Sequence, residues 1–289
     1  MTLGDVLYQI RCELAKADID CATAEAELLL CHSLGISRTQ LYTEPERLLT
    51  NTEANCLRQL VQRRLLHEPI AYILRCCEFY GIEFYIDNRA LIPRPETELL
   101  VEEAINFAGH HVARGRQLVV ADIGTGSGAI AISLALALPQ VKVYATDISA
   151  SALEVASINC QRHKVDNRVQ LLQGNLLEPL PEAIDIIVAN LPYIRDCELQ
   201  ALAPEIACFE PRLAIAGGNN GWDKMRLLLD QVPRRLHPDG CLLLEIGQGQ
   251  DEAVSSMTGS CFPQASVELV PDLSGINRVV RITLGSGCA

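Results

Sequence analysis

The stretch Asn190-Leu-Pro-Tyr193 carries the residue types best suited to chemistry, and it directly follows the apolar run Ile184-Asp-Ile-Ile-Val-Ala189. Such a run predicts a strand buried on both faces, and ligands of open α/β sheets bind beyond the carboxyl ends of these strands. Asn190 offers two N–H donors and a carbonyl acceptor, and Tyr193 offers a flat face for stacking. Pro192 restricts Leu191 to extended backbone. The site would suit an amide or an amino-substituted base, although an ordinary β-turn is the alternative interpretation.

A glycine-rich stretch, Asp122-Ile-Gly-Thr-Gly-Ser-Gly128, supplies a second site. Glycines allow a ligand close to the backbone, and the free N–H groups of a following helix point at it. The spacing differs from the Gly-x-Gly-x-x-Gly dinucleotide fingerprint. A carboxylate at Asp122 would repel a pyrophosphate and attract an ammonium group. The stretch therefore favours S-adenosylmethionine over NAD as the cofactor, with Gly124, Thr125, Gly126, Ser127 and Gly128 as its contacts.

Two further polar residues end the next predicted strands. Asp147 closes the strand predicted at 141–147, where an acid can accept from both ribose hydroxyls of an adenosine. Asn175 follows the strand predicted at 168–172, where an amide could face the adenine amino group. Either could be a simple cap or turn residue, but polar groups at three successive strand ends favour a methyltransferase.

The segment Leu91-Ile-Pro-Arg-Pro-Glu-Thr-Glu98 confines Arg94 between two prolines. It is either a stiff linker or a rigid wall that presents Arg94 to the active site, as a substrate-binding residue. The residues alone do not decide between these two interpretations.

Alternating strands and helices after residue 117 predict the elements that position these sites. Buried strands are expected at 118–122, 141–147, 168–172, 184–189, 213–216, 241–246 and 278–284, with helices at 96–107, 127–138, 150–164 and 223–236. This alternation indicates an α/β fold with a mostly parallel sheet and helices on both faces. The glycine-rich loop 217–221 is expected to be flexible.

The first seventy-five residues have a different pattern. Leu3, Val6, Leu7 and Ile10 recur at helical spacing after a capping-box-like start at Thr2, and further helices are expected from Asp20 and Thr52. Residues 1–75 are predicted to form a small helical domain. Residues 76–93, with turn residues Asp87-Asn88, are predicted to form a β-hairpin linker, and residues 94–289 the α/β domain.

Composition narrows the class of protein. The chain has 289 residues, 49% of them apolar and 21% charged, with a net charge of −12. Nucleic-acid binders normally concentrate Lys and Arg, so this charge disfavours direct nucleic-acid binding. Neither a signal peptide nor a membrane span is expected. The twelve cysteines and six histidines lack ligand spacing, which predicts reduced thiols, no metal and a cytoplasmic protein.

Three segments together resemble the release factor glutamine methyltransferases, the PrmC or HemK family. They are Leu91-Ile-Pro-Arg-Pro-Glu-Thr-Glu98, the segment from Phe209-Glu-Pro-Arg to Gly217-Gly218, and Asp272-Leu-Ser-Gly-Ile-Asn-Arg278. Asn190-Leu-Pro-Tyr193 is similar to the Asn-Pro-Pro-Tyr motif of methyltransferases that act on amide or exocyclic amino nitrogens. With the helical N-terminal region, the resemblance covers essentially the whole chain.

The resemblance implies a class I, Rossmann-like methyltransferase domain with a seven-stranded sheet. It also implies methylation of the glutamine amide nitrogen in the Gly-Gly-Gln motif of peptide chain release factors. Asn190, Leu191, Pro192 and Tyr193 would clamp the glutamine, Asn190 would also contact the cofactor, and residues 1–75 would dock the release factor. The protein would act as a monomer. Two departures stand out: Asn175 replaces the usual acid, and Leu191 replaces the first proline, so its side chain is either incidental or a packing residue.

Three other functions remain open at this point. An adenine-N6 methyltransferase of DNA or RNA would share the clamp but should carry a basic face. A non-catalytic methyltransferase-like binding protein would keep the fold alone. An NAD-dependent oxidoreductase is disfavoured by the glycine spacing.

Overall fold

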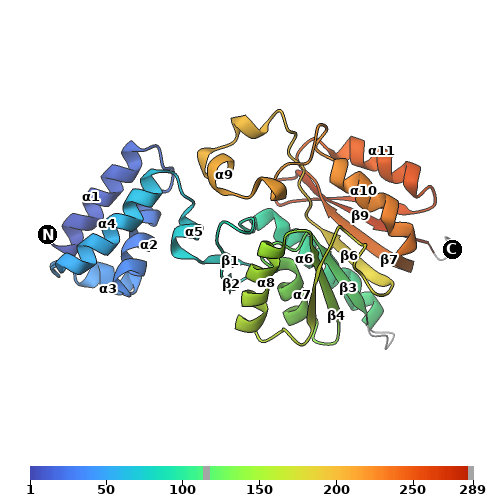
Figure 1. Ribbon diagram of the computed structural model, residues 1–289, viewed down its shortest axis with the longest axis horizontal. Helices are drawn as coiled ribbons and strands as arrows, with labels where there is room; N and C mark the ends of the chain where they lie inside the picture. Colours follow the sequence, from blue (N-terminus) through green and yellow to red (C-terminus); the bar gives the residue numbers. More distant parts are fainter. Residues whose placement is uncertain (113–117, 286–289) are drawn as a thin grey trace. The chain divides into compact units, whose positions relative to one another are not determined.

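The computed structural model describes residues 1–112 and 118–285, which form two compact units (Figure 1). Unit 1 contains Met1–Cys76 together with Ala203–Phe209. Unit 2 contains Cys77–Leu202 and the chain from Glu210 onward. A short segment from the second half of the sequence thus belongs to the N-terminal unit.

Unit 1 is helical, as the apolar spacing predicted. Its helices are α1 (Leu3–Lys16), α2 (Ala22–Leu34), α3 (Arg38–Thr43), α4 (Asn51–Leu65), α5 (Ile70–Leu74) and α9 (Pro204–Phe209). Side-chain caps start three of them, because Thr2, Ser37 and Thr50 each accept from the backbone N–H three residues later. Leucines of α1, α2 and α4 meet in one buried core. The second helix begins two residues later than expected, at Ala22 rather than Asp20.

Unit 2 is built on a seven-stranded sheet of order β5-β4-β3-β6-β7-β9-β8. Its strands are β3 (Val119–Ile123), β4 (Lys142–Asp147), β5 (Val169–Gln173), β6 (Ile184–Ala189), β7 (Leu236–Glu245), β8 (Ser266–Pro271) and β9 (Asn277–Thr283). The first five in this order are parallel, and β9 runs antiparallel to both of its neighbours. The mostly parallel seven-stranded sheet is therefore confirmed. The first strand of the sheet in the sequence is β3, and β4 and β5 follow on one side of it. The chain then crosses to β6 on the other side of β3. Ligands bind at such a switch point.

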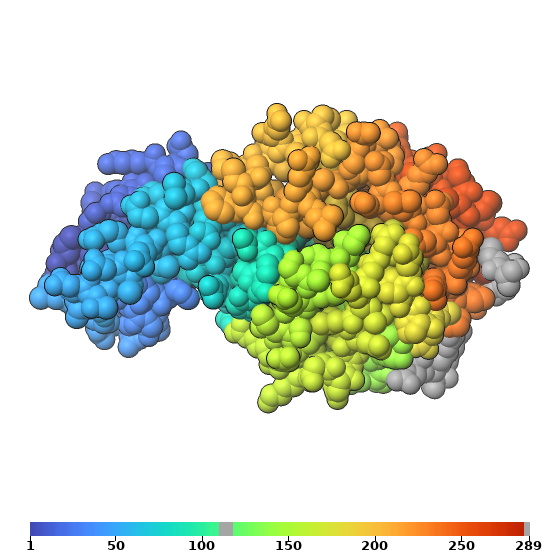
Figure 2. Space-filling model, in the orientation of Figure 1, coloured from blue at the N-terminus to red at the C-terminus, as the bar shows by residue number. Residues whose placement is uncertain are grey.

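Helices cover both faces of this sheet (Figure 1). On one face, α6 (Glu98–Val112), α7 (Ala129–Ala137) and α8 (Ala150–Arg162) pack over a core that includes Val120, Val143 and Val188. On the other, α10 (Asp223–Gln231) and α11 (Asp251–Cys261) pack over Ile187, Leu242 and Val280. In the space-filling view, the yellow-green atoms of α8 and the orange atoms of α10 both reach the surface of unit 2 (Figure 2). Within the two described ranges, no helix is long and apolar enough to span a membrane.

The hairpin is shorter than expected, and its predicted turn was wrong. Strands β1 (Cys77–Phe79) and β2 (Ile82–Phe84) are joined at Tyr80-Gly81, both with positive φ. Asp87-Asn88 lies beyond the hairpin. Asp87 holds Arg89 instead, accepting from its backbone N–H and its guanidinium, because an Asp side chain readily bonds the backbone two residues on.

The strand predicted at 213–216 was also wrong. This segment contains the 3₁₀ turn η3 (Arg212–Ala214), and Ala216 forms only an isolated parallel bridge with Ile194. The other 3₁₀ turns are η1 (Pro95–Thr97), η2 (Leu199–Ala201) and η4 (Val232–Arg234). The helix predicted at 96–107 therefore begins as η1 and continues as α6.

Candidate active site

An open cleft lies at the carboxyl ends of β3, β4 and β6. All of its walls belong to unit 2. The lining residues are Arg89, Ala90, Leu91, Gly124, Gly126, Thr146, Asp147, Ile148, Ser149, Ala152, Gly174, Asn175, Leu176, Asn190, Leu191, Pro192, Pro211, Leu213, Ala214 and Lys224.

The structure brings most of the predicted site residues to this cleft. Gly124 and Gly126 line it beside two predicted polar residues, Asp147 and Asn175. Asn190, Leu191 and Pro192 also line it. The remaining candidates are not among its lining residues: Thr125, Ser127, Gly128, Arg94 and Tyr193.

The glycine-rich loop is held by the neighbouring strand. The N–H groups of Gly124 and Thr125 both donate to the Thr146 carbonyl at 2.9 Å, and the Gly126 N–H donates to Asp147 Oδ2 at 2.9 Å. Gly124, Gly126 and Gly128 have φ of +74°, +55° and +84°, which a side chain would strain. A Cβ on Gly128 would also lie 3.1 Å from Ile132, so there is little room for a side chain at this position, where α7 begins.

Asp122 occupies a different place from the one expected. It is fully buried, absent from the cleft lining, and accepts from the Thr125 hydroxyl at 2.6 Å and the Ala131 N–H at 3.1 Å. Burial raises the pKa of Asp122 to about 7. Its carboxylate braces the loop and the start of α7, so the expectation that it attracts a cofactor ammonium from the cleft is not supported.

Asp147 and Asn175 present acceptors to the cleft. Asp147 accepts from the backbone N–H groups of Gly126 and Ser149, one on each oxygen. Burial raises its pKa above the ordinary value. The Asn175 Nδ2 donates to Glu178 at 2.9 Å, which leaves Asn175 Oδ1 to accept from a ligand.

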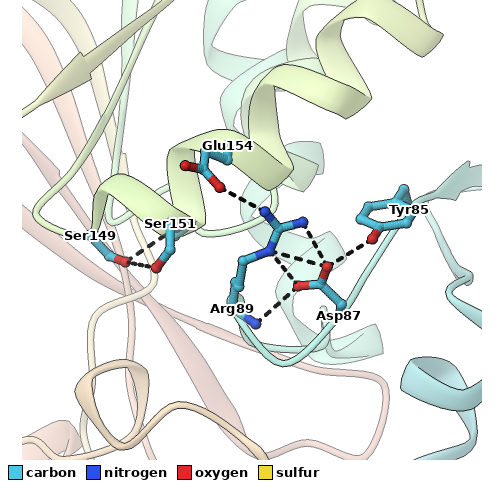
Figure 3. Close-up of polar contacts among 7 residues, drawn as sticks. Tyr85, Asp87, Arg89, Ser149, Ser151 and Glu154 are labelled. Carbon is cyan, nitrogen blue, oxygen red and sulfur yellow. Dashed lines mark hydrogen bonds and ion pairs between the residues drawn. The ribbon is translucent and has the colours of Figure 1, made fainter.

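The segment 85–91, whose residues 89–91 line the cleft, forms a wall that sequence reasoning missed. Arg89 is gripped by Asp87 and reaches Glu154 of α8 at 2.7 Å, while the Tyr85 hydroxyl donates to Asp87 at 2.8 Å (Figure 3). Arg89 lowers the pKa of Asp87 to about 2. These charge-assisted bonds fasten the wall to the helix beside the cleft.

Asn159 in α8 ties this wall to the cofactor loop. It is fully buried, accepts from the Tyr85 N–H at 2.7 Å, and donates to the carbonyls of Tyr85 and Ser127 at 2.9 Å. The amide oxygen and the amide nitrogen of Asn159 thus both bind backbone groups, and they hold the two segments in position. Its spacing in the sequence carries no signal of this function.

The predicted clamp follows β6 directly. Asn190 Nδ2 donates to the Thr97 hydroxyl at 3.0 Å, so its Oδ1 points away from Thr97. The Leu191 side chain is only 4% exposed and its Cδ2 lies 3.3 Å from where a Cβ on Gly124 would be. Leu191 therefore packs against the cofactor loop, and its side chain is not incidental.

Backbone contacts hold the end of the clamp. Gln250 donates from Nε2 to the Tyr193 carbonyl at 3.0 Å. A Cβ on Gly217 would lie 2.7 Å from the Pro192 carbonyl, and one on Gly221 would lie 2.5 Å from the Tyr193 carbonyl. The loop 217–221, expected to be flexible, is instead glycine-rich because it packs against the clamp backbone.

Arg94 lies outside the cleft lining but supports this region. It forms an ion pair with Glu210 at 2.5 Å, and Glu210 is almost fully buried. Burial raises the pKa of Glu210, and the Arg94 charge opposes that shift. The pair joins two of the segments that carry the family resemblance, the Pro-Arg-Pro segment and the Phe209-Glu-Pro-Arg segment.

Sequence reasoning also missed two buried polar residues behind the clamp. Thr97 is 3% exposed and accepts from Asn190, and Glu245 is 2% exposed at the end of β7. The Tyr193 hydroxyl donates to Glu245 at 3.4 Å. Burial raises the pKa of Tyr193 to about 12. Only the threonine of the Pro-Arg-Pro-Glu-Thr segment could have been noticed, since it belongs to a stretch already singled out.

The hydrogen-bond acceptors of the cleft fit S-adenosylmethionine. Asp147 stands at the end of β4 where ribose hydroxyls need an acceptor, and Asn175 Oδ1 is available for an amino group. The glycine loop leaves its own backbone accessible, because a Cβ on Gly126 would meet no atom closer than 4.0 Å. An adenosine with a charged methionine tail is therefore compatible with these residues.

Two family models match the chain. Residues 5–74 match the PrmC N-terminal domain, and residues 97–207 match the methyltransferase small domain. A release factor glutamine methyltransferase of Geobacter sulfurreducens is 41% identical over 288 residues, covering 98% of this chain and 97% of its relative. One from Koribacter versatilis is 38% identical over 97% of this chain and 98% of its own.

Solved structures with lower identity agree on the fold. A methyltransferase from Pyrococcus furiosus has a TM-score of 0.53 at 18% identity, covering 78% of this chain and 98% of its own. A ribosomal protein L11 methylase from Lactobacillus delbrueckii subsp. bulgaricus has a TM-score of 0.50 at 20% identity, covering 69% and 84%. Both similarities show the class I methyltransferase fold alone.

Proposed function

Because this chain belongs to the release factor glutamine methyltransferase family, we propose that it methylates the side-chain amide nitrogen (N5) of the glutamine in the Gly-Gly-Gln motif of peptide chain release factors. The enzyme is S-adenosylmethionine-dependent. The observation that carries the substrate proposal is the position of Asn190. The Asn190 amide nitrogen donates to the Thr97 hydroxyl, and Asn190 lines the same cleft as the cofactor loop.

The cofactor supplies an activated methyl group on a cationic sulfur. The cofactor contacts are Gly124 and Gly126 of the loop, with Asp147 for the ribose and Asn175 for the adenine amino group. Thr125, Ser127 and Gly128 shape the loop, and Asn190 stands where cofactor and substrate meet.

The substrate nitrogen is a weak nucleophile, because the lone pair of an amide is delocalised. To accept a methyl group it must lose planarity and gain positive charge. Asn190 Oδ1 and the Leu191 carbonyl accept the two N–H bonds, hold the nitrogen in line and stabilise that charge. Preorganised dipoles of this kind contribute on the order of 3 kcal/mol each.

Three other residues complete the substrate site. Pro192 stiffens the turn that presents the Leu191 carbonyl, and Tyr193 offers a face to the planar amide. Arg94 joins the Pro-Arg-Pro segment to the Phe209-Glu-Pro-Arg segment through its ion pair with Glu210. A general base is not required, because the nitrogen becomes strongly acidic once methylated and releases its proton to water.

Further properties follow from the same proposal. Release factors would be the protein partner, docked by the helical unit formed from residues 1–75. Residues 76–93, expected as a linker to the methyltransferase domain at 94–289, belong to unit 2 from Cys77 onward. The enzyme would act as a monomer, in the cytoplasm where translation terminates, with neither a metal nor a direct nucleic-acid partner.

Labelled methyl transfer tests this function. The full chain is incubated with methyl-labelled S-adenosylmethionine and a whole release factor, in parallel with the same factor carrying Gly-Gly-Ala and with duplex DNA. We expect label on the wild-type factor alone, mapped by peptide mass spectrometry to the glutamine amide. Label on the Gly-Gly-Ala factor or on DNA would reject the proposal that the glutamine of this motif is the substrate.

A further inference from the structure

The clamp Asn190-Leu-Pro-Tyr193 is held at its amino-terminal end by the sheet. Strand β6 stops at Ala189, which pairs with Ile123 of β3 and with Leu244 of β7. The Leu191 carbonyl lies two residues beyond this anchor. Because each residue has two soft backbone dihedral angles, this carbonyl keeps a fixed direction only when the chain is also held on its other side.

The chain beyond the clamp lies against the segment 215–221. The Ile194 N–H donates to the Ile215 carbonyl at 3.2 Å, and the Ile194 carbonyl accepts from the Gly217 N–H at 2.8 Å. The Tyr193 carbonyl takes no part in these backbone bonds. The last peptide group of the clamp therefore depends on another partner.

Gln250 supplies that partner. Its Nε2 donates to the Tyr193 carbonyl at 3.0 Å and to the Gly221 carbonyl at 3.4 Å. Its Oε1 accepts from the Gly247 N–H at 2.9 Å. One side chain thus joins the end of the clamp, the loop 217–221 and the turn between β7 and α11, which are separate in the sequence.

The orientation of the Gln250 amide follows from its neighbours. A backbone N–H only donates and a carbonyl only accepts, so Oε1 must face Gly247 and the NH₂ group must face the two carbonyls. The backbone of Gln250 is fixed as well, because its N–H donates to the Gly247 carbonyl at 3.1 Å and its carbonyl accepts from the Val254 N–H at 2.9 Å. Gln250 is therefore a rigid support that begins at the first turn of α11.

We propose that Gln250 is a positioning residue for methyl transfer, which fixes the carboxyl-terminal end of the clamp and so the direction in which the Leu191 carbonyl faces the substrate nitrogen. Without its amide, the Tyr193 and Gly221 carbonyls lose a shared donor, and the peptide groups between β6 and Ile194 gain freedom to turn. This inference rests on the proposed function of the Leu191 carbonyl as an acceptor, and it adds how that acceptor is held.

Two substitutions and a matched control test this role. Gln250→Met keeps the length of the side chain and removes its amide. Gln250→Glu keeps an acceptor for the Gly247 N–H but turns a second oxygen toward two carbonyls, which have no proton to donate. Gln231→Met is the control, because Gln231 at the end of α10 is also half-buried and also binds a backbone group, the Leu177 N–H at 2.9 Å.

Turnover should change while cofactor binding does not. We expect kcat on a whole release factor to fall at least about tenfold in both Gln250 variants, because the acceptor for the substrate N–H is displaced. The Kd of the cofactor should stay within about threefold of wild type, since Gln250 does not line the cleft. Gln231→Met should stay within about threefold of wild type in both quantities. Rates of the Gln250 variants equal to that of Gln231→Met would overturn the proposal.

Hydrogen exchange provides a readout without substrate. The Ile194 and Gly217 N–H groups should exchange at least about tenfold faster in both Gln250 variants than in wild type, because their bonds adjoin the lost contact. The Val188 N–H in β6 should keep its wild-type rate. The Gly247 N–H should exchange faster in Gln250→Met alone, because Gln250→Glu retains its acceptor. Unchanged exchange at Ile194 in both variants would also overturn the proposal.

The two readouts distinguish this inference from the proposed function. If the end of the clamp loosens in the Gln250 variants while the wild-type protein methylates no release factor, the proposed function fails and the anchoring by Gln250 stands. If the wild type methylates release factors and the Gln250 variants do so at the rate of the control, only the positioning role is wrong.

Discussion

Asp147 has two tasks at the scale of single residues. Its oxygens accept from Gly126 and Ser149, and the same carboxylate lines the cleft. Asp147→Ala should weaken S-adenosylmethionine binding by roughly 2 kcal/mol, about thirtyfold in Kd, because ribose hydroxyls lose a charged acceptor and the loop loses an anchor. Calorimetry measures this, with the exposed Asp166→Ala as control. Affinity equal to that of the control would remove Asp147 from the cofactor site.

Asp122 should make stability depend on pH. Its pKa rises from 3.8 to about 7 on folding through burial, so the folded protein holds its proton more tightly than the unfolded chain. The stability linked to this proton is complete below pH of about 4 and is lost as the pH rises to about 7. Asp122→Asn cannot titrate, so the free energy of unfolding of the wild type should fall relative to the variant over this window, by on the order of a few kcal/mol. Urea unfolding at pH 5 and pH 8 measures the difference. Parallel pH dependences in the two proteins would contradict this assignment.

Predictability at this scale depended on sequence distance. Asn190 to Tyr193 and the glycine loop are short continuous stretches, so their spacing was sufficient to find them. Thr97 meets Asn190, and Glu245 meets Tyr193, only because η1, β6 and β7 converge in the fold. Nothing in the sequence around Glu245 distinguishes it from a carboxylate at an ordinary strand end.

At the scale of elements, one buried cation holds α9 in unit 1. Arg64 of α4 is 5% exposed and forms ion pairs with Glu25 at 2.5 Å and with Glu205 of α9 at 3.2 Å. Arg64→Met leaves two poorly solvated carboxylates facing each other. We expect a loss of about 3 kcal/mol in the free energy of unfolding and faster hydrogen exchange in residues 203–209.

The control for this variant is on the same helix. Arg58 is exposed and reaches only Asn55 at 3.1 Å among the contacts described for it, so Arg58→Met should change stability by less than about 0.5 kcal/mol. Urea unfolding compares the two variants. If Arg64→Met is no less stable than Arg58→Met, the ion pairs do not hold α9.

Element prediction succeeded where patterns were strong and failed where local turn chemistry was misleading. Apolar runs correctly located β3, β4 and β6. Asp87-Asn88 looked like a hairpin turn, but the Tyr80-Gly81 pair took that position and Asp87 was used to hold Arg89. Strand β8 was missed because its residues are mostly exposed and one is proline, so it lacks an apolar run.

At the scale of the whole molecule, the helical unit should act on the protein substrate and not on the cofactor. All residues lining the cleft belong to unit 2. Deleting residues 1–75 should therefore leave cofactor affinity within about threefold of wild type, since none of these residues lines the cleft. It should reduce methylation of a whole release factor far more than methylation of a short Gly-Gly-Gln peptide. Rates measured on both substrates test this, and equal losses would mean that the unit is structural only.

The order of the chain explains why this division could be predicted only in part. The helical pattern of the first seventy residues pointed to a separate unit. Residues 203–209 also belong to this unit, although they follow the clamp in the sequence. Their partners, Arg64 and His67, precede them by more than a hundred residues. Local spacing carries no information about such a pairing.

The central claim is that Asn190 accepts a substrate N–H in the transition state for methyl transfer. The single-turnover rate of Asn190→Ala on a whole release factor, with cofactor affinity measured by calorimetry on the same preparation, tests it most directly. Asn167→Ala, an exposed change after α8, is the control. We predict a rate at least about a hundredfold below wild type with cofactor affinity within a few-fold. A rate equal to that of Asn167→Ala would contradict the account.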